Sequence, residues 1–90
     1  MPYTILCIDK ENKLNVRKIN RDEHLKYLKS FRKKLLLAGP ILDKNNLPSG
    51  SIIILDLDTK QEIEKFIKDD PYYKAGLFRE TKILNFKKVF

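Results

Sequence analysis

The sequence has few of the residues that build disulfides, metal clusters and membrane spans. Its 90 residues include one cysteine and one histidine, which excludes an internal disulfide and a cysteine-rich metal site. The one thiol, Cys7, lies in a strand-like run, where a buried small side chain is expected. No apolar run approaches the roughly 20 residues that span a bilayer, and the first residues show no signal-peptide pattern. We therefore expect a cytoplasmic protein with no membrane partner and no cofactor.

The composition predicts one globular domain spanning residues 1–90. Hydrophobic residues make up 42% and aromatic residues 10% of the chain, enough for one modest core. The net charge of +7 raises the question of nucleic-acid binding. The lysines and arginines are scattered, however, and the densest cluster, residues 32–34, lies on the polar face of a predicted helix. We expect no specific nucleic-acid partner, only weak, salt-dependent binding if any.

Residue spacing predicts the order strand, helix, strand, strand, helix, strand. The first helix should open with a capping box at Asn20 and Glu23, and the second with one at Thr59 and Glu62. Gly39 and Pro40 should end the first helix. The predicted strands are residues 3–8, 41–42, 52–57 and 78–90; the predicted helices are 20–38 and 59–70, with a loop over 10–19 and a turn over 43–49.

A turn near residue 70 organises the second half of the chain. Pro71 lacks a backbone N–H and disfavours helical geometry in the residue before it, so the second helix should stop near Asp70. Gly76 can adopt the positive φ that ends a short turn before the last strand. Asp70 is therefore expected at a helix end, among apolar and aromatic neighbours.

This order of elements is typical of an α+β fold, the ferredoxin-like βαββαβ sheet with two helices on one face. Right-handed crossovers make the first two strands parallel and put the third strand between them, antiparallel to both. The central strands are apolar on both faces, whereas the helices cover only one. The second face should therefore be buried by another copy of the chain, which predicts a homodimer.

The same topology brings polar side chains to one end of the sheet. His24 shares a helical stripe with Leu28, and Asp70 shares one with Phe66, so both should point inward. Antiparallel helices then bring His24 close to Asp70, with Asp9 at the end of the first strand as the other candidate carboxylate. The turn between the middle strands adds the candidate binding residues Ser49 and Ser51.

Several segments of the chain form a recognisable series: residues 21–28, 36–40, 50–51, 70–72, 75–76 and 86–90. Together they resemble the YCII-related (YciI-like) domain family, over nearly the whole chain. Asp9 and Arg17 also match that family. The chain departs from the family pattern in a shorter turn between the middle strands and in Asn85, where a proline is common.

The resemblance implies a dimeric α/β-barrel assembly whose histidine and aspartate form the active site. Carried onto this chain, these are His24 and Asp70, with Asp9 as a further candidate. The chemistry proposed for the family is proton transfer or elimination on a small, often cyclic, organic substrate, so the enzyme class would be a lyase or isomerase. Tyr72 lies in a matched segment and joins the candidate substrate-binding residues.

Other interpretations of these residues stay open. Asp70 could simply cap the turn after Pro71, and His24 could simply satisfy a buried acceptor. Arg17 and Arg21 could hold an anionic substrate or could be solvated. No metal is expected, because no ligand spacing on one element supports a site. The function is therefore either acid–base catalysis, with His24 as the base, or ligand binding without turnover in an accessory module.

Overall fold

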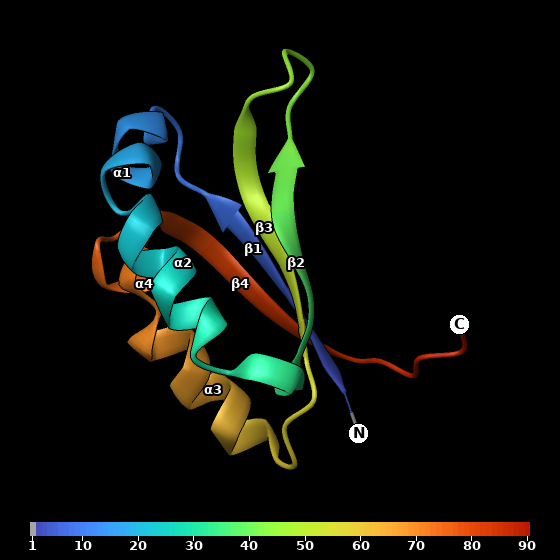
Figure 1. The fold of residues 1–90 in the computed structure, drawn as a ribbon. Coiled ribbons are helices and arrows are strands. Elements are labelled where there is room, and N and C mark those ends of the chain that lie inside the picture. Colours follow the sequence, from blue (N-terminus) through green and yellow to red (C-terminus); the bar gives the residue numbers. More distant parts are fainter. Residues whose placement is uncertain (1) are drawn as a thin grey trace.

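Four extended runs pair into one antiparallel sheet in the computed structural model, which describes residues 2–90 (Figure 1). The elements in chain order are β1 Tyr3–Asp9, α1 Leu14–Ile19, α2 Arg21–Lys29, a 3₁₀ turn η1 Arg32–Lys34, β2 Leu35–Leu42, β3 Pro48–Leu55, α3 Lys60–Asp69, α4 Pro71–Lys74 and β4 Phe78–Asn85. The strand order is β2-β3-β1-β4, and every neighbouring pair is antiparallel. The predicted ferredoxin-like topology, with β3 between β1 and β2, is confirmed.

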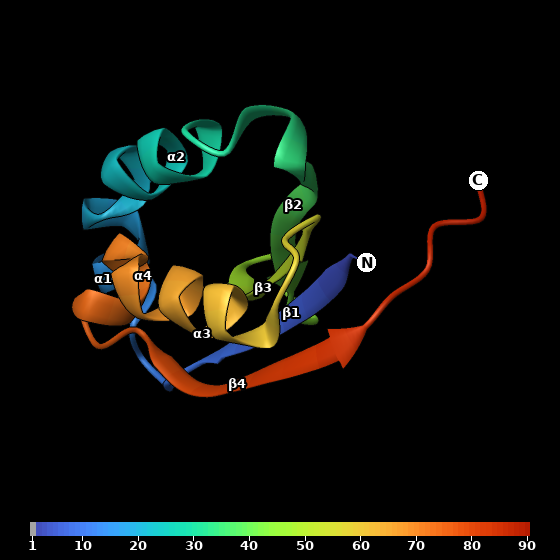
Figure 2. The ribbon, with the colours of Figure 1, turned by 90° about the horizontal axis from the view of Figure 1, so that it is seen from below.

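The helices lie together on one face of the curved sheet (Figure 2). Alternate residues of the central strands point toward them: Ile5 of β1 and Ile53 of β3 are fully paired across the ladder and almost fully buried. α3 contributes Ile63 and Phe66 to the same core. Burying each such side chain contributes roughly 1.5–3 kcal/mol, so this layer contact is the main source of stability.

Local signals around α3 act as the sequence predicts. The Thr59 hydroxyl accepts a hydrogen bond from the Glu62 backbone N–H and caps the helix. α3 ends at Asp69, and Pro71 starts the short helix α4. Gly76 has a φ of +73°, the left-handed conformation that lets the chain turn into β4.

The first predicted helix is too long. α2 ends at Lys29, and residues 35–38, expected to be helical, belong to β2. Arg32 has a φ of +52°, a left-handed conformation that ends the right-handed α-helix, and β3 then pairs with the residues that follow η1. The leucines at 35–37 fit either a helix or a strand by periodicity, so the non-local pairing decides the outcome.

The segment before α2 also differs from expectation. Residues 14–19, predicted as loop, form α1. Asn20 does not cap α2 with its side chain; its amide instead donates to the Val16 carbonyl, so this capping box is absent. The sequence shows no amphipathic helical pattern for α1, because the buried side chain of this helix is Arg17, a charged residue.

Several strand boundaries shift as well, most clearly the start of β3 and the end of β4. β3 begins at Pro48 instead of residue 52, because its first residues pair with the end of β2. β4 ends at Asn85 instead of residue 90, since Asn85 pairs with Tyr3, near the start of β1, and no strand continues beyond it. Within residues 2–90, no helix has the length and apolarity needed to cross a membrane.

Candidate active site

A cavity of about 620 Å³ lies between the helices α1 and α2 on one side and the strands β2 and β3 on the other. Its walls are largely apolar, with Leu28 from α2 and Ile53 from β3 among the lining residues. The polar residues His24, Arg17, Ser51 and Tyr72 also line it. The cavity therefore combines an apolar body with a few grouped polar side chains, which is typical of small-molecule sites.

His24 and Asp70 form a buried pair beside this cavity. The imidazole Nδ1 lies 2.8 Å from Asp70 Oδ1, and the two residues are 6% and 1% exposed. The same Oδ1 accepts a 2.9 Å hydrogen bond from the Tyr72 backbone N–H, which makes Asp70 the cap of α4. The predicted hydrogen bond between His24 and Asp70 is therefore present, and so is the capping role of Asp70.

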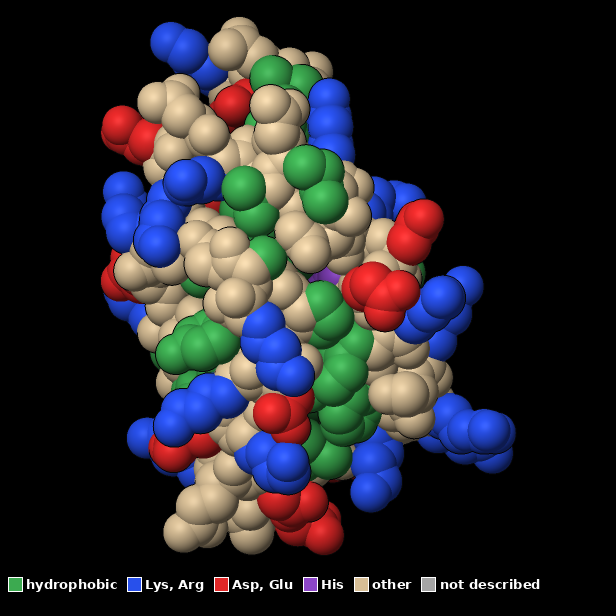
Figure 3. All heavy atoms as spheres, turned by 90° about the vertical axis from the view of Figure 1, so that its left-hand side faces the viewer, with side chains coloured by type: hydrophobic (Ala, Val, Ile, Leu, Met, Phe, Trp, Pro, Cys, Tyr) green, Lys and Arg blue, Asp and Glu red, His purple; other side chains and the backbone are tan. Residues whose placement is uncertain are grey.

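The hydrogen bond determines which imidazole nitrogen faces the cavity. When the Asp70 carboxylate is ionised it can only accept, so Nδ1 is the donor, and in a neutral imidazole Nε2 then presents its lone pair. Nε2 has no protein partner among residues 2–90, and no fully buried polar side-chain atom there is unpaired. Nε2 must therefore be accessible. Figure 3 shows the one histidine as a small area between larger side chains.

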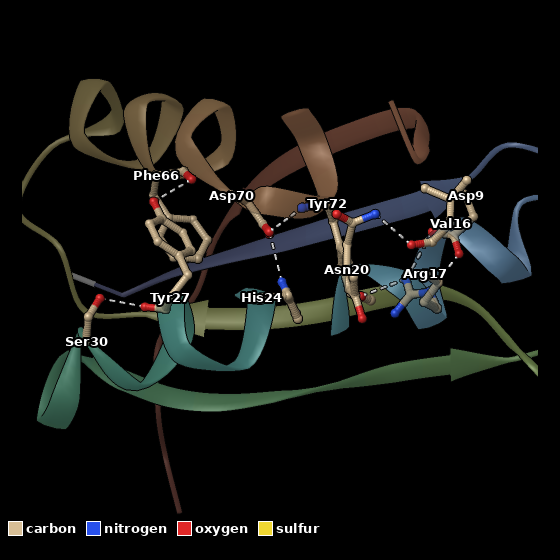
Figure 4. A network of polar contacts seen from close by, with 11 residues as sticks. Asp9, Val16, Arg17, Asn20, His24, Tyr27, Ser30, Phe66, Asp70 and Tyr72 are labelled. Atoms are coloured by element: carbon tan, nitrogen blue, oxygen red, sulfur yellow. Dashed lines mark hydrogen bonds and ion pairs between the residues drawn. The ribbon is translucent and has the colours of Figure 1, made fainter. Parts of the chain in front are cut away.

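Tyr72 stands between the histidine and Arg17 (Figure 4). Its ring stacks on the imidazole, with 3.8 Å between centroids and 13° between planes. The Arg17 guanidinium carbon lies 4.7 Å from the centroid of the same ring. Both contacts orient planar groups against an aromatic face, so Tyr72 fixes the positions of His24 and Arg17 relative to each other.

Arg17 is held by two partners. Its Nε and Nη2 donate to the two Asp9 carboxylate oxygens at 2.8 and 2.9 Å, and Nη2 also donates to the Ser51 hydroxyl at 3.0 Å. Arg17 is 6% exposed, so the possibility of a solvated loop arginine is wrong. Burial acts to lower the pKa of Arg17, but the bond and charge of Asp9 outweigh it and raise that pKa.

Burial also raises the pKa of two neutral groups near His24 and Asp70. The pKa of the Cys7 thiol rises from 9.0 to about 12, first because of burial and then because of the Asp70 charge. The pKa of the Tyr72 hydroxyl is raised by burial, while Arg17 and Arg21 act in the opposite direction. Cys7 is therefore a protonated core residue, as predicted from its strand context.

The structure brings most of the candidate residues to one place. His24, Asp70, Arg17, Ser51 and Tyr72 form one continuous group of contacts. Arg21 lines the cavity from α2. Within residues 2–90, no three His, Cys, Asp or Glu side chains are grouped to hold a metal ion.

Two candidates do not contact the imidazole. Asp9 contacts Arg17, not the imidazole, because its carboxylate is engaged by the guanidinium. Ser49 bonds the Ile41 carbonyl and lines a separate hollow, so it does not join the group around His24. The prediction that His24, Asp70, Asp9, Ser49 and Ser51 converge at one point was therefore too broad.

Sequence reasoning did not foresee the apolar wall of the cavity. Residues 35–40 of β2 line it, and they were expected to be mostly helical. Their run of leucines followed by Gly39 and Pro40 was the available signal, since a proline fits an edge strand such as β2.

Comparison with known proteins identifies the family and relatives of this chain. The model of the YCII-related domain family matches residues 1–87. An uncharacterised protein of Haemophilus influenzae is 35% identical, and Protein YciI of Escherichia coli is 32% identical; each alignment covers all of both chains.

Solved structures extend the comparison. The 5-chloro-2-hydroxyhydroquinone dehydrochlorinase TftG of Burkholderia phenoliruptrix, in complex with 2,5-dihydroxybenzoquinone, superposes with a TM-score of 0.90 at 32% identity, covering 97% of this chain and 94% of that one. An antibiotic biosynthesis monooxygenase-type protein of Bacteroides thetaiotaomicron has a TM-score of 0.60 at 9% identity, over 100% of this chain and 90% of the other. The second likeness concerns the fold alone.

Proposed function

The chain belongs to the YCII-related domain family, and from this membership and the cavity we propose that it is a small-molecule enzyme in which His24 and Asp70 move a proton. The observation that carries the proposal is the 2.8 Å bond between Nδ1 and Oδ1, which leaves Nε2 accessible at the cavity. A neutral histidine oriented in this way can act as a general base.

The reaction begins at an acidic C–H next to a carbonyl group of the substrate. His24 Nε2 takes the proton, and the electron pair of the broken C–H bond moves onto the carbonyl oxygen as an enolate. Asp70 stabilises the imidazolium that forms, because its carboxylate accepts from Nδ1 in a buried setting. If the enolate is conjugated with a further C=C bond, it can take the proton back at the far carbon of that bond. If the carbon next to the carbanion carries a leaving group, the enolate can instead expel that group, which departs with its bonding electron pair. The first outcome is isomerisation and the second elimination.

The relative TftG supports both the reaction class and a cyclic substrate. A dehydrochlorinase removes a proton and a chloride, which is the elimination branch. Its ligand, 2,5-dihydroxybenzoquinone, is a planar six-membered ring, and the cavity of this chain offers apolar walls such as Leu28 and Ile53 to such a ring. We therefore expect a planar cyclic carbonyl compound as substrate.

The enzyme is a homodimer in this proposal. The sheet face without helices carries apolar side chains from all four strands, and in a single chain they stay partly exposed; Ile52, for example, is 38% exposed and Leu84 51%. A second copy packed on this face would bury them and close the two sheets into an α/β barrel. The apolar residues of this face are Leu6, Ile8, Leu37, Ile41, Ile52, Ile54 and Leu84, and Thr4, Glu80 and Lys82 share it.

The experiment compares wild type with His24→Ala. Both proteins are incubated with 5-chloro-2-hydroxyhydroquinone and with a panel of cyclic ketones in deuterium oxide, and chloride release and deuterium uptake are measured. We expect His24→Ala to keep its fold and lose turnover by about a hundredfold or more, the usual effect of removing a positioned acid–base group. Lys26→Ala, an exposed change on the same helix, is the matched control and should keep its activity.

Two results would contradict the proposal. One is a folded His24→Ala protein with wild-type turnover. The other is a wild-type protein that binds 2,5-dihydroxybenzoquinone but neither exchanges protons nor releases chloride with any compound. The second result would favour the alternative function, a ligand-binding or accessory module without turnover.

A further inference from the structure

A second hollow of about 460 Å³ lies next to the main cavity. It is formed by the segment between β1 and α1 together with the hairpin that joins β2 to β3, and these lie at the same end of the molecule (Figure 1). The two hollows share three lining residues, Leu14, Leu47 and Pro48. These three apolar residues, which we call the end wall, therefore separate the main cavity from the second hollow.

The main cavity is long in the direction of the end wall. β3 lines it from Ile53, in the core, to Pro48, in the end wall. Strand residues rise roughly 3.3 Å each, so this stretch of β3 is about 16 Å long. A single six-membered ring is much shorter than this. A ring beside His24 therefore leaves room for a substituent that runs along β3 toward the end wall.

The hairpin holds its part of the end wall in a fixed position. The Asp43 backbone N–H donates to the Leu47 carbonyl at 2.8 Å, and the Leu47 N–H donates to the Asp43 carboxylate at 3.1 Å. The same carboxylate oxygen accepts from the Asn45 N–H at 2.8 Å. Asn46 has a φ of +62°, a conformation that asparagine tolerates in turns. None of these contacts uses the Leu47 side chain, so that side chain can be replaced without loss of the turn.

Leu47 is the member of the end wall whose side chain the fold needs least. Leu14 begins α1 and Pro48 begins β3, so both belong to regular secondary structure. Leu47 belongs to the turn, and its side chain stays 45% exposed, so its burial contributes little to stability. It nevertheless reaches both hollows. Its bulk is therefore better explained by the space that it closes than by packing in the core.

We propose that Leu47 determines substrate specificity, because its side chain ends the main cavity and limits the length of any substituent that a cyclic substrate carries toward the hairpin. The substrate is then a ring whose substituent on that side is absent or short and apolar. This inference rests on the proposed function, since it restricts the substrate of the same site. Removing the bulk of Leu47 joins the two hollows and admits longer substituents.

The test uses a graded set of ligands and three variants. The ligands are 2,5-dihydroxybenzoquinones with one straight alkyl chain on the ring, from methyl to decyl, and calorimetric titration measures each dissociation constant. Leu47→Ala lowers the end wall, and Leu47→Phe enlarges it. Leu42→Ala is the matched control, because Leu42 is 51% exposed and lines neither hollow.

The profile of affinity against chain length carries the answer. Each methylene that becomes buried should tighten binding by about fourfold. In wild type this gain should stop where the chain reaches Leu47. In Leu47→Ala it should continue, so that the longest chains bind this variant at least about tenfold more tightly than wild type, while the methyl compound binds both equally. Leu47→Phe should stop the gain at a shorter chain, and Leu42→Ala should match wild type.

Two profiles would overturn the inference. One is the same profile for wild type and Leu47→Ala, and the other is a wild-type gain that continues through the longest chain. If Leu47→Ala does not fold, Leu47→Phe decides instead, and an unchanged profile in that variant refutes the inference. Binding and turnover separate the two proposals. A length limit at Leu47 without any turnover would contradict only the enzyme reaction, whereas turnover that depends on His24, with a profile that Leu47 does not influence, would contradict only this inference.

Discussion

Replacing Asp70 tests whether its carboxylate serves the fold or the chemistry. Asp70→Asn keeps the size of the side chain and one carbonyl oxygen. That oxygen can still accept from the Tyr72 N–H and from His24 Nδ1, the two bonds that Oδ1 now accepts. The variant loses only the negative charge. We therefore expect it to fold with a loss of less than about 1 kcal/mol in the free energy of unfolding.

Asp70→Ala is the contrasting change, because it removes both bonds. Loss of the α4 cap costs about 1 kcal/mol, and an unpaired, buried Nδ1–H costs about 1–3 kcal/mol. The sum predicts a loss of roughly 2–4 kcal/mol in unfolding free energy. Urea denaturation of the two variants and wild type, followed by circular dichroism, measures this difference.

Activity should separate from stability in this pair. Asp70→Asn should lower turnover by about 10- to 100-fold despite its near-normal stability, since the imidazolium loses a charged hydrogen bond. The loss of the Asp70 charge can also be measured without substrate, through the pKa of Cys7. Burial is the main cause of the high pKa of Cys7, but the Asp70 charge is the next one, so Asp70→Asn should lower that pKa in a thiolate absorbance titration.

Specific results would refute this reasoning. If Asp70→Asn is destabilised as much as Asp70→Ala, the charge itself supports the fold. If Asp70→Asn is stable and keeps wild-type turnover, the carboxylate is only a helix cap. An unchanged pKa of Cys7 would contradict the electrostatic contact between the two residues.

Two further predictions concern stability and assembly. Below pH 9 the Cys7 thiol is protonated in the folded and the unfolded chain; between pH 9 and about 12 only the unfolded chain loses the proton, so the free energy of unfolding should fall, by at most about 1.4 kcal/mol per pH unit. Cys7→Ala should reduce this slope in urea titrations across that range, and an unchanged slope would contradict the burial of the thiol. Light scattering at micromolar concentration should give the mass of a dimer for wild type and of a monomer for Ile52→Lys. A stable wild-type monomer would contradict the proposed assembly.

The sequence by itself determined the topology and the central pair. Pro71 and Gly76 act through local backbone geometry, which needs no partner, and both took effect as expected. The right-handed crossover then fixes the order of the strands and the direction of the helices. That order is sufficient to bring His24 to Asp70, because each lies on an inward stripe set by helical spacing alone.

Only the tertiary structure decided whether residues 35–38 form a helix or a strand. Three consecutive leucines satisfy the pattern of a helix or of a strand, and β3 resolved the ambiguity by supplying hydrogen-bond partners from a distant part of the chain. The wall of the cavity therefore lay beyond prediction, because β2 forms much of it. Information of this kind resides in pairing between strands, not in local spacing.

The role of Arg17 was likewise decided in three dimensions. An arginine in a polar stretch looks solvated, since burying a charge without partners is prohibitive. The fold makes burial favourable by placing the Asp9 carboxylate and the Ser51 hydroxyl, from β1 and β3, around one guanidinium. The sheet register and the position of α1 bring these partners to Arg17, and the sequence pattern did not predict α1. Local spacing thus predicted the contact between His24 and Asp70, whereas long-range packing formed the cavity and buried the cation beside it.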